Sequence, residues 1–179
     1  VAGHAFLVLE YLPLGENRPE TMERLGRQLA ALHRQPQAGF GWQRDNFIGS
    51  TPQPNPPSTD WIEFWRESRL GFQLELAARN GHGGAWLRRG EALRVRLNGL
   101  FVGHRPTPAL LHGDLWNGNA GCTVAGEPVV FDPAVYYGDR EADLAMTELF
   151  GGFSDRFYAA YREALPLADG YPQRRTLYN

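Results

Sequence analysis

Apolar residues in the first part of the chain follow two different spacings. Residues 5–11 form a short, nearly continuous apolar run, which predicts a buried strand that ends within residues 12–15. Over residues 19–34, leucines recur at i, i+4 and i+7 (Leu25, Leu29 and Leu32), so this stretch predicts a helix with one apolar face. Its first residue is proline, which the first turn of a helix tolerates.

Residues 36–59 show neither a continuous apolar run nor the helical spacing of apolar residues. They contain five of the 13 prolines together with Gly39, Gly41 and Gly49. We interpret them as a long ordered loop, because the aromatic residues Phe40, Trp42 and Phe47 can anchor it.

The middle of the chain predicts two helices. Asp60, followed three residues later by Glu63, has the pattern of a capping box, so we expect a helix from this point to about Arg79. A second helix is expected over residues 86–102, where leucines again have helical spacing.

Beyond residue 108 the predicted elements become short. They are a strand at 110–112, a Gly/Asn-rich loop at 113–119, a hairpin of residues 120–124 and 128–131, and helices at about 140–150 and 154–164. The expected fold class is therefore mainly α (α+β), with helices and a small antiparallel hairpin.

Composition narrows the function classes. The 179 residues are 42% hydrophobic with a net charge of −2, so neither a nucleic-acid nor a membrane partner is indicated. The single cysteine, Cys122, excludes a disulfide framework and a cysteine-rich zinc site. No apolar run approaches the length of a membrane span. We expect a cytoplasmic location.

Three oxygen-bearing side chains are expected to converge on one cleft. Asp114 begins the loop at 113–119, Asn119 ends it, and Asp132 follows the second hairpin strand, which folds it back beside the loop. A carboxylate beside an acceptor hydroxyl, together with hard oxygen ligands for Mg²⁺, is what phosphoryl transfer from a nucleotide requires. The pattern predicts a phosphotransferase.

The residues around these three narrow the prediction. His112-Gly113-Asp114-Leu115-Trp116-Asn117-Gly118-Asn119 closely resembles the catalytic loop of the fructosamine kinase family, a branch of the aminoglycoside-phosphotransferase-like superfamily. Residues 131–138 and 140–145 resemble the family's metal-binding segment and following helix, and residues 46–55 and 61–64 resemble its lobe insert. The resemblance implies the C-terminal lobe of the protein-kinase-like fold, with the hairpin carrying the catalytic and metal-binding residues.

The resemblance also implies a reaction. Members use ATP and Mg²⁺ to phosphorylate the sugar 3-hydroxyl of ketosamines, which are fructosamine or ribulosamine adducts of amines or protein lysines. The unstable product then releases the amine, so the activity reverses glycation. By this resemblance Asp114 accepts the hydroxyl proton, Asn119 and Asp132 bind Mg²⁺ and thereby the nucleotide, and the hinge backbone at Glu10, Tyr11 and Leu12 binds adenine.

Three neighbouring residues have expected supporting roles. Trp116 either stacks on the sugar adduct or packs under the loop. His112 is expected to orient the loop rather than act as a base. Asp143 is expected to accept hydrogen bonds from the loop backbone, because a buried carboxylate must be paired.

The expected domain organisation is incomplete. Residues 1–15 would be the last small-lobe strand and hinge, and residues 16–179 the helical large lobe. All 18 basic residues are arginine, so the phosphate-binding lysine of kinase-like folds is not in this sequence. We therefore expect the small lobe to lie outside this chain, and the chain alone to be inactive.

Three other functions compete with this prediction. One is a related kinase for an aminoglycoside, choline or homoserine-like acceptor, and another is an inactive kinase-like binding module. The third is a metal hydrolase, which the sequence disfavours because its five histidines show no paired ligand spacing. It also lacks a Gly-x-Ser-x-Gly nucleophile elbow.

Overall fold

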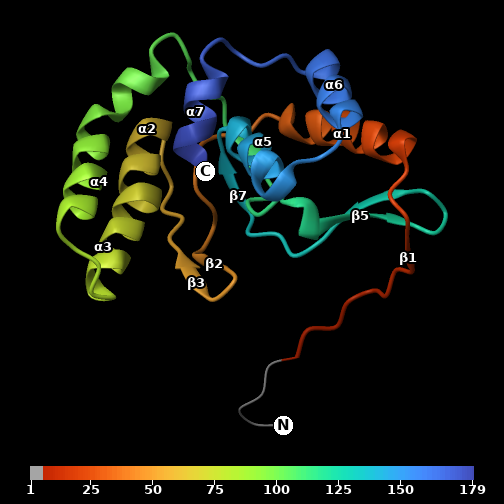
Figure 1. Ribbon diagram of the computed structural model, residues 1–179, viewed down its shortest axis with the longest axis horizontal. Helices are drawn as coiled ribbons and strands as arrows, with labels where there is room; N and C mark the ends of the chain where they lie inside the picture. Colours follow the sequence, from red (N-terminus) through yellow and green to blue (C-terminus); the bar gives the residue numbers. More distant parts are fainter. Residues whose placement is uncertain (1–5) are drawn as a thin grey trace.

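The computed structural model describes residues 6–179, which form helices around small antiparallel sheets (Figure 1). This confirms the predicted mainly helical class. The helices are α1 (Pro19–His33), α2 (Trp61–Phe64), α3 (Phe72–Arg79), α4 (Ala85–Arg96), α5 (Arg140–Glu148), α6 (Asp155–Ala164) and α7 (Tyr171–Tyr178). The strands are β1 (Leu14–Gly15), β2 (Asn46–Ile48), β3 (Thr51–Gln53), β4 (Ala109–Leu111), β5 (Ala120–Thr123), β6 (Pro128–Val130) and β7 (Tyr136–Gly138).

The strands of residues 6–179 pair in three small sheets, ordered β1-β5-β6, β2-β3 and β4-β7. The predicted hairpin is confirmed as β5 and β6, where Ala120 pairs with Val130. Strand β7 was not predicted. It pairs antiparallel with β4, with Leu111 opposite Tyr136.

Helices α1 and α6 pack together and form one core cluster. Leu25 and Leu29 of α1 are buried with Phe157 and Tyr161 of α6. Gly26 permits this close approach, because a Cβ at this position would lie 2.4 Å from the Phe157 carbonyl oxygen. The helix predicted over residues 19–34 is confirmed as α1.

The expected apolar stripe of α1 is shorter than predicted. Its third leucine, Leu32, is 37% exposed, although Leu25 and Leu29 are buried. The stripe ends one turn earlier because Ala30 and His33, not Leu32, face the interior there.

A second, mainly aromatic cluster underlies residues 36–59. Phe40 is buried against Trp61, and Trp42 packs on Tyr137 with ring centroids 4.8 Å apart. The loop is ordered as predicted, but Phe47 is 62% exposed and does not anchor it. Phe47 instead lies in the hairpin β2–β3, which the sequence did not predict.

The long helix expected from residue 61 to Arg79 is present but contains a π-helical segment, Trp65–Gly71, between α2 and α3. Asp60 caps it, since its side chain accepts a hydrogen bond from the Glu63 N–H at 3.0 Å. The second predicted helix is α4, which continues as a 3₁₀ turn over Leu97–Phe101. No helix in residues 6–179 combines the length and apolar character needed to cross a membrane.

The predicted buried strand at residues 5–11 is wrong. Residue 5 lies outside the described residues, and residues 6–11 form no strand and are exposed. In Figure 1 this segment runs away from the body of the molecule. The apolar run is not buried, because none of the described strands pairs with it; regular pairing begins only at β1.

Candidate active site

Two loops meet because of how the strands pair. The chain leaves β4 through residues 112–119, enters β5, returns along β6, and then pairs β7 with β4. Residues 112–119 and 131–135 therefore connect the same two sheets. A backbone bond from the Phe131 N–H to the Asn119 carbonyl, 3.1 Å long, joins them.

Asp114 and Asn119 are in direct contact within the first loop. The Asn119 side-chain amide donates to the Asp114 backbone oxygen at 2.8 Å and to the Asp114 carboxylate Oδ2 at 3.0 Å. These two acceptors fix the orientation of the amide. Across residues 6–179, the Asn119 Oδ1 and the Asp114 Oδ1 accept no hydrogen bond, so both oxygens are available to a ligand.

The environment makes Asp114 more basic than an ordinary aspartate. Burial raises the pKa of its carboxyl, and the nearby charges of Asp132 and Asp143 add to the rise. The hydrogen bond from Asn119 and the proximity of His112 oppose it. A carboxylate of raised pKa is a better proton acceptor.

His112 ties the two loops together. Its Nδ1 accepts from the Asp114 N–H at 3.3 Å, and its Nε2 lies 2.9 Å from the Phe131 carbonyl oxygen, which can only accept. Nε2 therefore carries the ring proton. The His112 carbonyl also accepts from the Ala134 N–H at 2.9 Å.

Asp132 lies between these two attachments, two residues beyond the end of β6. It is exposed, and its φ of 54° is unusual for a residue other than glycine. Phe131, just before Asp132, and Ala134, two residues after it, are both hydrogen-bonded to His112, so contacts on both sides hold the strained backbone. Asp132 is close enough to Asp114 to affect its pKa.

Asp143, on α5, holds the start of the first loop. Its Oδ2 accepts from the His112 N–H at 2.7 Å, and its Oδ1 from the Gly113 N–H at 2.8 Å. His33 of α1 lies 3.3 Å from the same Oδ2 and 2.8 Å from the Tyr161 hydroxyl. His33 was not identified from the sequence, because it is separated from Asp143 by 110 positions.

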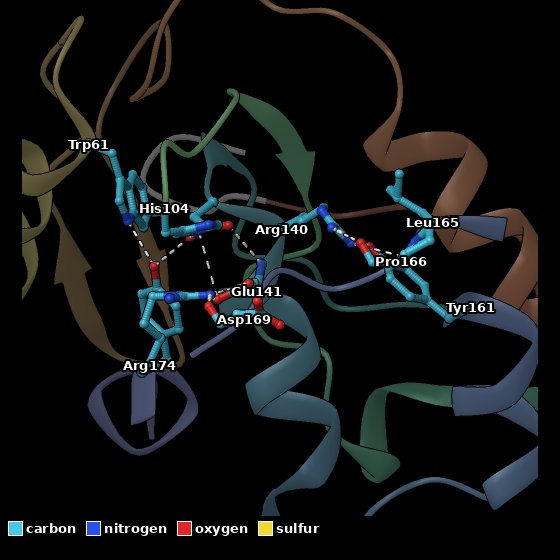
Figure 2. A network of polar contacts seen from close by, with 11 residues as sticks. Trp61, His104, Arg140, Glu141, Tyr161, Leu165, Pro166, Asp169 and Arg174 are labelled. Carbon is cyan, nitrogen blue, oxygen red and sulfur yellow. Dashed lines mark hydrogen bonds and ion pairs between the residues drawn. The ribbon is translucent and has the colours of Figure 1, made fainter. Parts of the chain in front are cut away.

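A polar network fixes the first turn of α5 (Figure 2). Asp139 caps the helix by accepting from the Glu141 N–H at 3.1 Å. The Asp139 Oδ2 lies 2.8 Å from both His104 Nε2 and the Tyr178 hydroxyl. That hydroxyl accepts from Trp61 Nε1 at 2.8 Å. The network thus positions the helix that carries Asp143.

His104, Asp139 and Glu141 bring three potential metal-ligand atoms within 4.8 Å of one another. The carboxylate oxygens of Asp139 and Glu141 already have protein partners, however. Glu141 binds the buried Arg174 through both carboxylate oxygens, at 2.6 and 2.9 Å (Figure 2). Because Arg174 supplies the compensating charge, we assign these residues to holding α5 against α7.

Trp116 lies over its own loop. A Cβ on Gly118 would lie 2.2 Å from the Trp116 ring, so a side chain at this position would have to displace the ring. The ring also meets Phe150 edge-on, with centroids 5.7 Å apart. Phe150 is 73% exposed and has a positive φ of 54°, a combination that the sequence did not reveal.

Glu10, Tyr11 and Leu12 lie in the extended segment before β1, not at the end of a buried strand as predicted. Tyr11 is 88% exposed. The segment joins the sheet just after them, where Pro13 accepts a hydrogen bond from the Val124 N–H at 3.1 Å. The structure therefore brings Asp114, Asn119, Asp132, His112 and Asp143 together, and places this segment on the side of β5.

Comparison with known proteins gives a consistent result. The family model described as "Fructosamine kinase" matches residues 1–179. A probable ketoamine kinase of Synechocystis sp. is 50% identical over 182 residues, which cover 99% of this chain and 60% of that protein. A chloroplastic protein-ribulosamine 3-kinase of Oryza sativa subsp. indica is 43% identical over 98% of this chain and 52% of its own length.

Solved structures agree. The crystal structure of a putative fructosamine-3-kinase from Thermobifida fusca has a TM-score of 0.87 at 41% identity, covering 94% of this chain and 59% of that one. The corresponding protein from Haemophilus somnus gives a TM-score of 0.85 at 31% identity, covering 94% and 56%. The chain thus spans between half and two thirds of each of these relatives.

Proposed function

The chain belongs to the fructosamine kinase family, and from this premise we propose that the protein containing it uses ATP to phosphorylate the sugar 3-hydroxyl of ketosamines. The observation that carries the proposal is the contact between Asp114 and Asn119 on one loop, which leaves one oxygen of each available to ligands. A relative named as a ribulosamine 3-kinase supports the choice of acceptor.

We assign Asp114 as the proton acceptor. Its Oδ2 is occupied by the Asn119 amide, so the acceptor hydroxyl would approach Oδ1. Burial raises the pKa of the carboxyl and makes the carboxylate a stronger base. Asp143 and His112 position the loop backbone on either side of it.

The oxygen donors around Asp114 fit a magnesium ion. Asn119 offers a neutral amide oxygen and Asp132 an exposed carboxylate, and hard oxygen ligands of this kind suit Mg²⁺ with its bound water and phosphate oxygens. When bound with ATP, the ion would neutralise charge on the transferred phosphoryl group. Asn119 and Asp132 would hold it, and Asp114 would remain the proton acceptor.

We propose that residues 16–179 form the large lobe of a kinase-like fold and that residues 1–15 lead into it from a small lobe. The exposed segment at Glu10, Tyr11 and Leu12 would then be the hinge that binds adenine through its backbone. The family relatives, which extend well beyond the region that this chain matches, support this division.

The test uses the whole protein that contains this chain, with ribulosamine and fructosamine acceptors and an assay coupled to ADP release. Asp114→Asn should lower kcat by about 10² or more, as expected for removing a general base. Glu163→Gln, a change to a surface ion pair, should have no effect. A near-normal rate for Asp114→Asn would refute the role of Asp114.

The same assay addresses the closest competing function. An aminoglycoside, choline or homoserine acceptor that is phosphorylated faster than any ketosamine would assign the protein to another branch of the superfamily. Absence of turnover with every acceptor, together with absent ATP binding, would favour a binding module.

A further inference from the structure

A cavity of about 310 Å³ adjoins the candidate active site. Its wall includes Gly113 and Asp143, next to Asp114 in the loop arrangement described above. Another part of the wall comes from the π-helical segment and the hairpin β2–β3, and it includes Trp65, Arg69 and Gln53. A group bound here would lie close to an acceptor whose hydroxyl reaches Asp114.

The π-helical segment turns polar and apolar residues toward this cavity together. The backbone hydrogen bonds of a π-helix join residues five positions apart, and Trp65 lines the wall together with Arg69 and Leu70, which lie about one turn further along. Such segments are less favourable than an α-helix and occur frequently at functional sites. The local geometry therefore serves to present Arg69 beside the loop.

Arg69 is a largely buried cation that makes no direct ion pair with a carboxylate among residues 6–179, although the charge of Asp45 acts on it from farther away. Its Nη1 donates to the Pro54 and Ser68 carbonyls at 2.6 and 3.1 Å, and its Nη2 donates to the Asn55 Oδ1 at 2.7 Å. All three acceptors are neutral. Its Nε is buried and has no hydrogen-bond partner.

The aromatic neighbours of Arg69 compensate its charge only in part. The guanidinium lies 4.2 Å from the centroid of Tyr136 and 4.6 Å from that of Phe64. Burial raises the pKa of the Tyr136 hydroxyl, so this group stays neutral and supplies no counter-charge. Burying a cation is costly unless an anion accompanies it.

The carboxylate of Asp143 in the same wall does not form an ion pair with Arg69. Its oxygens already accept from the backbone of His112 and Gly113, and His33 Nε2 lies 3.3 Å away. The cavity thus combines a carboxylate that is satisfied by the protein with a guanidinium that has no direct ion pair.

We propose that this cavity receives the amine-bearing part of the acceptor and that Arg69 selects acceptors with a carboxylate on that part, such as ketosamines of amino acids. This rests on the proposed kinase function. Three hydrogen bonds occupy three of the five guanidinium donors, and the Nε–H is buried, so one Nη2 N–H is left for a ligand. A planar carboxylate is a suitable acceptor for a guanidinium.

The test compares three ribulose adducts as acceptors of the whole wild-type protein: those of glycine, glycinamide and aminomethylphosphonate. They present a carboxylate, a neutral amide and a phosphonate in the same position. We expect the KM for the glycinamide adduct to exceed that for the glycine adduct by about 10- to 100-fold, the range for a charged hydrogen bond, with similar kcat.

Arg69→Gln should remove this preference by raising the KM of the glycine adduct, and Arg69→Lys should retain part of it. Arg66→Gln is the matched control, because Arg66 lies on the same π-helical segment but outside the cavity wall. Since the KM ratio compares two acceptors on one protein, a reduced folded fraction of a variant does not change it.

Each outcome is decisive. Equal KM values for the glycine and glycinamide adducts in the wild type overturn the inference and leave the kinase function intact. A clear preference for the phosphonate adduct overturns the carboxylate assignment in favour of a phosphate-bearing acceptor. Absence of phosphorylation of all three, and of fructosamine and ribulosamine generally, overturns the proposed function and this inference with it.

Discussion

Replacing Asp143 by asparagine tests how the loop that carries Asp114 is held. The carboxylate accepts two short hydrogen bonds from the backbone N–H groups of His112 and Gly113, at 2.7 and 2.8 Å. Asparagine has almost the same volume, but only one of its two terminal groups can accept. The other is an NH₂ group that would face a backbone donor.

The expected cost follows from these contacts. Losing one hydrogen bond to a charged group costs about 1.5–3 kcal/mol, and leaving a buried N–H unsatisfied costs about 1–3 kcal/mol. Removing a buried charge recovers part of this, so we expect a net loss of about 2–4 kcal/mol in the free energy of unfolding. For a domain of 150–250 residues this corresponds to a fall in Tm of about 4–16 °C, and to a smaller fall in a longer protein.

Activity should fall with stability but for a separate reason. If the loop shifts by about 1 Å, Asp114 no longer meets the acceptor hydroxyl, and kcat should fall by about 10²-fold at temperatures where the variant is fully folded. Calorimetry and the coupled assay on the whole protein measure the two effects. Glu163→Gln serves as the stability control, since its 72% exposed side chain should change the free energy by less than about 0.5 kcal/mol. Unchanged Tm and kcat in Asp143→Asn would refute the reasoning.

Three further predictions concern neighbouring groups. Burial raises the pKa of Asp114, and only the ionised carboxylate accepts a proton. The value of kcat/KM should therefore fall with decreasing pH, with an apparent pKa above the ordinary aspartate value of about 3.9. A pH profile that is flat down to that value would contradict this. Arg174→Met removes the arginine partner of the buried Glu141 and should lower the free energy of unfolding by about 3–5 kcal/mol, much of which the added change Glu141→Gln should restore. Urea unfolding measures both effects, and an unchanged midpoint for the single variant would count against a buried pair. Gly113→Ala should lower kcat more than tenfold, because glycine there has a φ of 81° and a Cβ would lie 2.1 Å from the Ala134 carbonyl oxygen; wild-type kinetics would show that the loop can move aside.

The sequence predicted elements whose determinants are local. Helix α1 has its own apolar period, and the hairpin β5–β6 has its own turn, so both were found. The contact between Asp114 and Asn119 spans five positions of one loop, and their approach to each other was likewise expected.

Features that depend on distant partners were missed. Strand β7 exists because β4 pairs with it, and its three residues carry no periodic signal. The apolar run at residues 6–11 was predicted as a buried strand, but burial requires a covering element that its own sequence does not specify. The same limit applies to His33, whose proximity to Asp143 arises from packing of α1 against other helices.

The π-helical segment illustrates a third kind of limit. Residues 61–79 have the composition of an ordinary helix, and one helix was predicted. Whether such a helix widens locally depends on the small energy difference between alternative hydrogen-bond patterns, which contacts such as those of Arg69 with residues 54 and 55 can decide.

His112 has a consequence for how this site should be dissected by mutation. Through its ring and its carbonyl it holds the backbone on both sides of Asp132, and through its ring it also contacts the backbone of Asp114. A change at His112 would therefore disturb both carboxylates at once. The free-energy effects of His112→Ala and Asp132→Asn should not add, and a double-mutant cycle would measure the coupling energy between the two residues. Kinetics of the single variants alone would assign this shared energy wrongly, partly to the proton acceptor and partly to the metal ligand.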